Sequence, residues 1–243
     1  MPDTAAMPAP RLRDRLGLGD AFAGYEVEAG RVDMQGWNSA HPFFAVAIRL
    51  VQPQVVIELG VWKGMSTIEM ARLMKAEGID GEILAVDTWL GSSGHLSQAG
   101  RRDELRPVQG YPTLYRTFLA NVATAGHTDV VTPLAMDGTS AAVALARLGV
   151  RAGIIHIDAS HEYAAALADF RNYWPLLSDT GILIVDDYGS WPGVTRAACE
   201  FAAEVDRPLF GSMAKAMIPK DPSLGFDMRF VRARRYRRTP EKD

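Results

Sequence analysis

A buried strand that ends in two adjacent carboxylates constrains the fold of this chain most strongly. Residues 182–185 form the apolar run Ile-Leu-Ile-Val, and Asp186 and Asp187 follow directly. Because the run lacks the apolar–polar alternation of a half-exposed strand, we expect helices to cover both of its faces. Such strands are typical of α/β proteins, which bind ligands at the carboxyl ends of their parallel strands. The two carboxylates are therefore predicted to lie at a ligand-binding edge.

Strand and helix patterns alternate along the chain from about residue 46. Expected strands cover 55–60, 82–87, 130–136, 153–158 and 181–187, with two weaker ones near 208–218 and 226–232. Expected helices cover 64–78, 111–126, 140–149, 162–178 and 193–205. Pro133 marks the third strand as an edge strand or a bulge, and Pro175 predicts a bend near the end of its helix. The alternation predicts an α/β fold with a mostly parallel sheet.

The chain is expected to consist of an N-terminal extension, residues 1–45, and a main domain, residues 46–243. The extension contains Tyr25, Trp37 and the pair Phe43–Phe44, which is too many aromatic residues for a free linker. We therefore expect it to pack on the main domain, as a cap over the substrate or as a subunit contact in a homo-oligomer. Residues 229–238 contain six Arg; a solvated basic end after a final strand is favoured over a nucleic-acid-binding tail.

Composition excludes several function classes. The net charge of −3 provides no general basic field for nucleic acid. The single cysteine, Cys199, rules out an internal disulfide and argues against a thiolate zinc site. A membrane span needs about 18 or more consecutive apolar residues, and the sequence has no such run. The N-terminus lacks the apolar core of a secretory signal, so a cytoplasmic location is expected, with no membrane partner.

A glycine-containing turn joins the first expected strand to the first helix. Gly60 permits a tight turn, and Gly64 permits close approach of a ligand or a helix. Trp62 occupies the place of the second glycine in a dinucleotide-binding motif, so a compact nucleoside fits better than a pyrophosphate. Asp87 ends the second strand, where a carboxylate can accept both ribose hydroxyls. The alternative is a structural turn in which Asp87 caps a helix.

Three carboxylates are expected to meet at neighbouring strand ends. Asp158 ends the strand 153–158 as Asp186 and Asp187 end the strand 181–187. Oxygen ligands of this kind are those that Mg²⁺ and Ca²⁺ prefer, so the trio is a candidate site for one divalent cation. The alternative is that these acids cap the following helices or pair with arginine.

Four sequence segments resemble class I S-adenosylmethionine-dependent methyltransferases. They are ELGVWKGMS (58–66), AVDTW (85–89), HIDASHEY (156–163) and LLSDTGILIVDDY (176–188). The last two together are similar to small metal-dependent O-methyltransferases that act on the sugars of natural products. The resemblance covers about residues 50–205. It implies a Rossmann-like, seven-stranded, mostly parallel sheet with helices on both faces and the last strand antiparallel.

The resemblance also implies roles for individual residues. Those expected around the methionine part of S-adenosylmethionine are Glu58, Gly60, Gly64 and Ser66. Asp87 is expected to hold its ribose, while Trp89 borders the adenine and Asp137 approaches the adenine edge. For Asp137 the alternative is a plain helix cap made with the hydroxyl of Thr139 or Ser140. The expected ligands of Mg²⁺, or of another divalent cation, are Asp158, Asp186 and Asp187.

His161 is the candidate catalytic base, acting together with Asp158. Catechol-type relatives place Asn at the position of Asp187 and a lysine base shortly after the first Asp, whereas this chain has His161 three residues after Asp158. The sugar-modifying branch shares that histidine. His161 could instead be an inert histidine at a helix start, and His156, inside an apolar strand, is interpreted as a core residue.

The expected function is therefore O-methylation of a hydroxyl on a small molecule, with a sugar or polyol-like natural product as the expected acceptor. Two alternatives stay open. One is another metal-assisted reaction on the same scaffold, as in a cephalosporin-hydroxylase-like branch. The other is a non-catalytic nucleoside-binding subunit.

Overall fold

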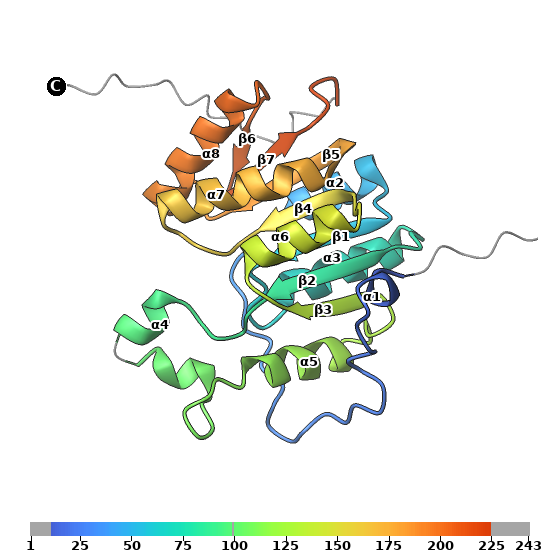
Figure 1. Ribbon diagram of the computed structural model, residues 1–243, viewed down its shortest axis with the longest axis vertical. Helices are drawn as coiled ribbons and strands as arrows, with labels where there is room; N and C mark the ends of the chain where they lie inside the picture. Colours follow the sequence, from blue (N-terminus) through green and yellow to red (C-terminus); the bar gives the residue numbers. More distant parts are fainter. Residues whose placement is uncertain (1–10, 99, 225–243) are drawn as a thin grey trace, which may run out of the picture.

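A seven-stranded sheet forms the centre of the computed structural model, which describes residues 11–98 and 100–224. The strands are β1 (Val55–Leu59), β2 (Glu82–Asp87), β3 (Val131–Ala135), β4 (Ala152–Ile157), β5 (Leu177–Asp186), β6 (Phe210–Ser212) and β7 (Lys215–Pro219). Their order is β3-β2-β1-β4-β5-β7-β6. The pairs from β3 to β5 are parallel, whereas β7 runs antiparallel to both of its neighbours. This confirms the expected Rossmann-like fold (Figure 1).

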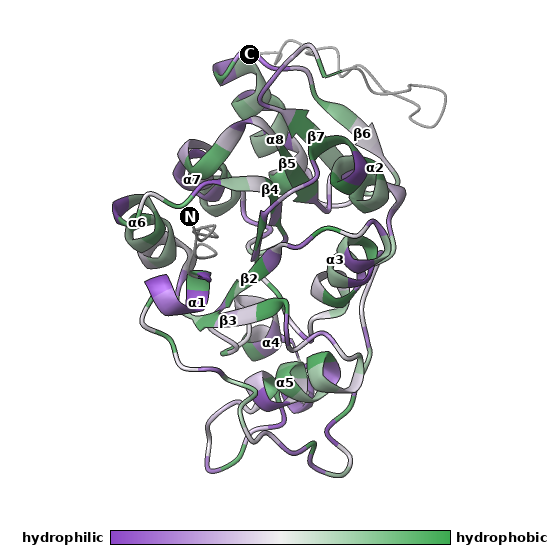
Figure 2. Cartoon of the chain, turned by 90° about the vertical axis from the view of Figure 1, so that its right-hand side faces the viewer, coloured by the Kyte–Doolittle hydropathy of each residue, from purple (hydrophilic) through white to green (hydrophobic). Residues whose placement is uncertain are grey.

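Helices cover both faces of the sheet (Figure 2). One face packs against α1 (Leu12–Arg15), α6 (Gly138–Arg147), α7 (Tyr163–Tyr173) and α8 (Pro192–Glu204). The other packs against α2 (Pro42–Val51), α3 (Met65–Ala76) and α5 (Leu114–Thr124). Side chains of β5 alternate between the two cores: Leu183 and Val185 belong to the first, Ile182 and Ile184 to the second. The apolar run therefore has covered faces on both sides, as its lack of alternation predicts.

Several element boundaries differ from those expected. The helix expected over 162–178 ends at Tyr173, because Pro175 lies in a short 3-10 turn, η2 (Trp174–Leu176), after which β5 begins at once. Both final strands fall within 208–219 as a hairpin, and the expected strand at 226–232 lies outside the described residues. β3 is an edge strand, as Pro133 indicates.

The N-terminal extension runs along the α3–α5 side of the domain. Lys63 binds Asp33 through an ion pair of 2.7 Å, and the side chain of Asn121 donates to the backbone of Asp33. The expected boundary at residue 45 falls inside α2, where Phe43 and Phe44 are buried in the core. The extension therefore merges with the domain through α2. Within residues 11–98 and 100–224, no helix combines the length and apolar character needed to cross a membrane.

A long connection joins β2 to α5. It contains α4 (Ser93–Ser97) and a 3-10 turn, η1 (Arg102–Leu105). The ring of His95 stacks on that of Trp62 at a centroid distance of 4.7 Å, which holds the connection against the glycine turn after β1.

Candidate active site

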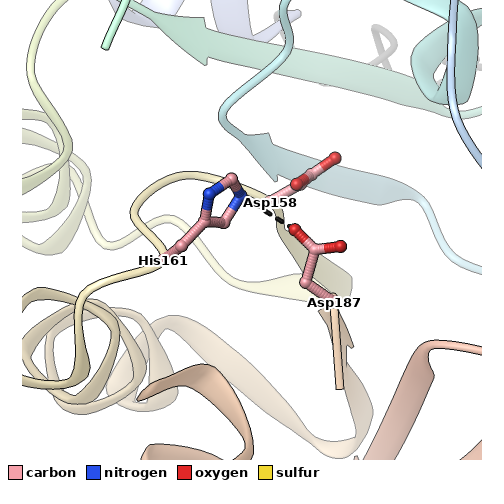
Figure 3. Close-up of side chains that lie close together, drawn as sticks. All are labelled: Asp158, His161 and Asp187. Carbon is pink, nitrogen blue, oxygen red and sulfur yellow. Dashed lines mark ion pairs between the residues drawn. The ribbon is translucent and has the colours of Figure 1, made fainter. Parts of the chain in front are cut away.

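Asp158, His161 and Asp187 form a compact polar group at the carboxyl ends of β4 and β5 (Figure 3). One ligand atom from each lies within 4.8 Å of the others. Asp158 follows the last residue of β4, and Asp187 follows the last residue of β5, its neighbour in the sheet. Parallel strands end at one edge, so the two carboxylates converge there, as the sequence predicts.

His161 is fixed by contacts on its edge and on its face. Its Nε2 lies 2.8 Å from Oδ2 of Asp187. The indole of Trp191, the residue before α8, stacks on the imidazole at a centroid distance of 4.4 Å and an interplanar angle of 19°. A Cβ at position 193 would lie 2.6 Å from the backbone oxygen of His161, so Gly193 permits the start of α8 to approach this loop. The ring is therefore held beside both carboxylates.

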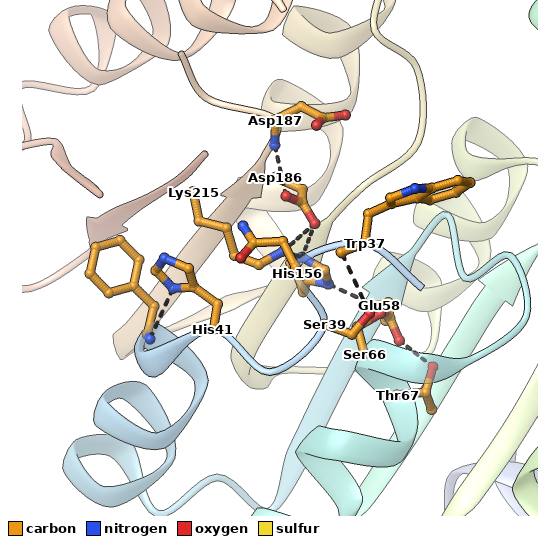
Figure 4. Close-up of polar contacts among 12 residues, drawn as sticks. Trp37, Ser39, His41, Glu58, Ser66, Thr67, His156, Asp186, Asp187 and Lys215 are labelled. Carbon is orange, nitrogen blue, oxygen red and sulfur yellow. Dashed lines mark hydrogen bonds and ion pairs between the residues drawn. The ribbon is translucent and has the colours of Figure 1, made fainter. Parts of the chain in front are cut away.

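Asp186 lies next to this polar group and also contacts a buried lysine and a buried histidine (Figure 4). It forms an ion pair with the buried Lys215, and its Oδ2 lies 3.5 Å from Nε2 of His156. The reason is the alternation of a strand, since Asp186 continues the side of β5 occupied by Ile184, whereas the next residue turns away. The structure thus groups Asp158, His161 and Asp187, while Asp186 lies beside Asp158, shares a side-chain hydrogen bond with it and pairs with Lys215. The metal-binding roles expected for Asp158, Asp186 and Asp187 stay predictions.

The two inward carboxylates differ in charge state. Burial, together with the nearby carboxylate of Asp186, raises the pKa of Asp158 well above its usual range. Burial acts in the same direction on Asp186, but the hydrogen bonds and charges of His156 and Lys215 outweigh it and hold its pKa below the usual range. Asp186 is therefore ionised and paired with a cation. Asp158 instead lies beside other carboxylates, whose negative charges disfavour its ionised form.

A series of buried hydrogen-bonded side chains extends from Asp186 to the start of α3. His156 is fully buried, and its Nδ1 lies 3.0 Å from Oε1 of Glu58. Glu58 is also fully buried and accepts hydrogen bonds from the hydroxyls of Ser66 and Thr67 at the start of α3. The core role expected for His156 agrees with this. The expected contact of Glu58 and Ser66 with a methionine group stays a prediction, since both belong to this interior chain.

The glycine turn after β1 lies directly against the polar group. Gly60 has φ +80°, and a Cβ there would collide with the carbonyl oxygen of Asp158. Gly64 has φ +88°, and a Cβ there would lie 2.8 Å from the ring of Phe118 on α5. Gly64 therefore permits the approach of a helix, one of the two possibilities expected for it, while Gly60 brings the turn to the loop of Asp158.

The carboxylate of Asp87 stabilises this turn through hydrogen bonds to its backbone. Its Oδ2 accepts hydrogen bonds from the backbone N–H groups of Val61 (2.8 Å) and Trp62 (2.9 Å), and its Oδ1 accepts one from Trp89 (2.8 Å). The carboxylate is half-buried at the end of β2, and among the described residues its hydrogen bonds go to backbone N–H groups of the turn and of Trp89. Its contact with ribose stays a prediction.

Trp89 and Asp137 have structural roles in the described chain. Trp89 is 2% exposed, packs on Phe118 at 5.0 Å between ring centroids, and donates its indole N–H to the carbonyl of Trp62. Asp137 caps α6 by accepting a hydrogen bond from the backbone N–H of Ser140 at 2.9 Å. The helix-cap alternative is therefore observed, with the Asp137 carboxylate as the capping group rather than a hydroxyl. The adenine contacts expected for Trp89 and Asp137 stay predictions.

Sequence reasoning missed Lys215 and Trp191. Lys215 lies in a strand that was only weakly indicated, and because lysine is rarely fully buried, its sequence neighbourhood carried no signal. Trp191 carried no signal in its sequence neighbourhood, because its stacking on His161 depends on the tertiary placement of the α8 start.

Comparison with known proteins identifies the family. The model of the methyltransferase domain family matches residues 57–188, from within β1 to just beyond β5, and so includes the glycine turn and the polar group. The chain belongs to this family. The match confirms the resemblance to class I S-adenosylmethionine-dependent methyltransferases and the expected enzyme class, a methyltransferase.

Solved structures share the fold at low sequence identity. The O-methyltransferase NovP is 20% identical, with a TM-score of 0.56 over 73% of this chain and 78% of that one. The calicheamicin methyltransferase CalS11 is 21% identical, with a TM-score of 0.54 over 73% and 77%. TomG from Streptomyces achromogenes, an O-methyltransferase of tomaymycin synthesis solved in complex with SAM, is 15% identical, with a TM-score of 0.54 over 77% and 82%. No curated protein matches the chain.

Proposed function

We propose that this methyltransferase transfers the methyl group of S-adenosylmethionine to a hydroxyl of a small molecule, with the help of a divalent cation. The acceptor class that we favour is a sugar or polyol-like natural product. The observation that supports this most strongly is the convergence of Asp158, His161 and Asp187 beside the glycine turn of the family. Among the proteins that share the fold, NovP is named an O-methyltransferase, CalS11 a calicheamicin methyltransferase, and TomG an O-methyltransferase of tomaymycin synthesis.

The residues of the polar group fit a divalent cation. The two carboxylates have oxygen atoms within 4.8 Å of each other and of the imidazole, and oxygen donors of this kind suit Mg²⁺, Mn²⁺ and related ions. The unbalanced negative charge around Asp158 is the charge that a cation would offset. When bound, the cation would supply Lewis acidity, which lowers the pKa of a hydroxyl and orients it.

His161 is the residue proposed to remove the proton from the acceptor hydroxyl. Its Nε2 lies in hydrogen-bond distance of the Asp187 carboxylate, which can only accept when ionised. The proton of the neutral ring is therefore placed on Nε2, and Nδ1 has the lone pair that takes up the proton of the hydroxyl. Trp191 keeps the ring in this orientation by stacking on it.

The donor is proposed to bind at the turn after β1. S-adenosylmethionine provides an electrophilic methyl group on a sulfonium. The chain's own contribution is a backbone turn held by Asp87 and placed against the loop of Asp158 through Gly60. This contact keeps the donor site next to the acceptor group, which favours reaction by positioning.

The proposal is tested by isothermal titration of the full chain with S-adenosylhomocysteine, with and without Mg²⁺, followed by methyl-transfer assays on sugar and polyol acceptors. We expect cofactor binding in wild type and loss of metal binding in Asp158→Ala. Cofactor and metal binding with no methyl transfer to hydroxyl acceptors would favour another metal-assisted reaction. No affinity for either would favour a non-catalytic subunit and reject the proposal.

A further inference from the structure

We propose that Trp37 is a specificity-determining residue whose indole face binds the ring of the acceptor, so that the enzyme takes a neutral cyclic polyol, such as a pyranose, in preference to an open-chain one. This inference rests on the proposed function, since it places the acceptor hydroxyl at the polar group of Asp158, His161 and Asp187. Trp37 belongs to the N-terminal extension and is 61% exposed.

The segment around Trp37 is held against the turn that follows β1. Four residues earlier, Asp33 forms an ion pair of 2.7 Å with the buried Lys63, which belongs to that turn. Gly36 packs so closely on the first residue of α3 that an added Cβ would lie 2.6 Å from the Cβ of Met65. The backbone of this segment therefore lies at the carboxyl end of β1, beside the proposed donor site.

The same segment also reaches the hairpin of β6 and β7. The side-chain Nδ2 of Asn38 donates a hydrogen bond of 2.7 Å to the carbonyl of Met213, in the turn of that hairpin. Two residues after Met213, Lys215 pairs with Asp186 at the carboxyl end of β5. In the sheet order β1-β4-β5-β7, a segment that joins the end of β1 to this hairpin passes the ends of β4 and β5. It therefore runs along the edge of the sheet that holds the polar group (Figure 4).

Two indoles flank this edge from opposite faces of the sheet. Trp191 precedes α8, which packs on one face, and its ring covers the imidazole of His161. Trp37 follows the glycine that packs on the start of α3, a helix of the other face. An acceptor between them would direct its hydroxyls to the carboxylates and the imidazole, and its C–H groups to the indole of Trp37. A pyranose ring presents hydroxyls and a flat C–H face together, whereas an open-chain polyol has no fixed face.

The charge of the site and the fixed position of Trp37 both favour a neutral ring. The carboxylates of Asp158, Asp186 and Asp187 lie close enough to affect one another electrostatically, and they would repel an anionic acceptor. The Trp37 segment is held by contacts on both sides before any acceptor binds, so less conformational entropy is lost when a ring packs on the indole. A large apolar side chain that is exposed but held beside a polar group is typical of a binding site.

The test is saturation-transfer NMR on the full chain with S-adenosylhomocysteine and Mn²⁺ present. The probes are methyl α- and β-pyranosides of the common hexoses, compared with sorbitol as the open-chain polyol. We expect wild type to bind at least one pyranoside, with the strongest saturation on the C–H groups of one ring face, and to bind sorbitol about 10-fold more weakly. Trp37→Ala should weaken pyranoside binding by about 10-fold or more, whereas Trp37→Phe, which keeps an aromatic face, should lose less than about 3-fold.

The matched control is Tyr111→Ala, which removes an aromatic side chain that is 67% exposed on the connection between β2 and α5. This variant should bind the pyranosides as wild type does. The affinity for S-adenosylhomocysteine, measured by isothermal titration, should be unchanged in all of these variants, because none of them alters the donor turn.

Four results would overturn the inference and leave the proposed function in place. They are equal pyranoside binding by wild type and Trp37→Ala, sorbitol binding as tight as pyranoside binding, no pyranoside binding by a wild type that binds S-adenosylhomocysteine, and a specific loss of S-adenosylmethionine affinity in Trp37→Ala. The last result, with S-adenosylhomocysteine affinity unchanged, would assign the indole to the positive sulfonium through a cation–π contact. Failure of wild type to bind S-adenosylhomocysteine would reject the proposed function itself, and the inference with it.

Discussion

The imidazole Nε2 of His161 lies 2.8 Å from Oδ2 of Asp187, across the gap between the loops that follow β4 and β5. This contact joins the candidate base to a candidate metal ligand and so limits what His161 can do. With its proton on Nε2 it can accept a second proton through Nδ1, whereas an unprotonated Nε2 would make it a third ligand.

Substitution of His161 distinguishes these roles. If it is the base, His161→Ala lowers turnover by about 10²–10⁴-fold and leaves the affinities for S-adenosylhomocysteine and Mn²⁺ close to those of wild type. Both are measured by titration, and turnover by methyl transfer to an acceptor found by screening. The neighbouring exposed Glu162, changed to Gln, serves as the control. A parallel loss of Mn²⁺ affinity in His161→Ala would assign it as a ligand, and unchanged turnover would remove it from the site.

Gly60→Ala tests the contact between the donor turn and the loop of Asp158. The new Cβ would collide with the Asp158 carbonyl oxygen at a backbone φ of +80°. We expect a loss of cofactor and metal affinity together, since both loops must shift, and a fall of several degrees in melting temperature. Gly78→Ala is the matched control, with φ +68° and no atom within 4 Å of the added Cβ. Equal effects of the two substitutions would show that the loss in Gly60→Ala comes from backbone strain alone and not from the collision with the loop of Asp158.

The lowered pKa of His41 leads us to expect a smaller free energy of unfolding in mild acid. Burial, followed by the charge of Lys215, lowers the pKa of His41 to about 4 from about 6.5. The unfolded chain then binds more protons than the native one between these values, so stability falls as the pH drops from about 6.5 to 4. The full effect is about 3 kcal/mol.

Urea unfolding across this pH range checks the effect. His41→Asn keeps a side-chain acceptor for the backbone N–H of Phe43, which the imidazole Nδ1 now binds at 3.1 Å. The stability difference between wild type and this variant should shrink steadily as the pH is lowered from 6.5 to 4. A difference that is constant with pH would show that His41 titrates normally.

The sheet and its order of helices could be predicted from the sequence because the apolar runs are long and regularly spaced. β2 matches its expected bounds. β4 and β5 both begin earlier than the strands expected at 153–158 and 181–187, and each ends one residue before its expected end. The convergence of Asp158 and Asp187 follows from the parallel pairing of β4 and β5.

The position of Asp186 could not be predicted in the same way. It depends on which face of β5 the last residue belongs to, and on a cation that arrives from β7, about thirty residues later. The short hairpin of β6 and β7 has little periodicity, so the sequence did not reveal that Lys215 would lie opposite Asp186. Two adjacent residues at a strand end start from opposite faces of the strand, so their contacts depend on what packs against each face.

The buried carboxyl of Asp169 on α7 indicates that removal of its negative charge should stabilise the folded protein. Burial raises the pKa of its carboxyl to about 6, so its ionised form is disfavoured in the native state. Below about pH 3.8 the carboxyl is protonated in both states and has no effect; the destabilisation grows as the pH rises to about 6 and is complete above it. Asp169→Asn, which resembles the protonated form, should therefore stabilise the protein at pH 7 by up to about 3 kcal/mol and have no effect near pH 3.5. Thermal unfolding at both pH values checks this, with the exposed Asp179→Asn as control. A stabilisation that persists at pH 3.5 would show that the gain comes from packing or hydrogen bonding rather than from charge.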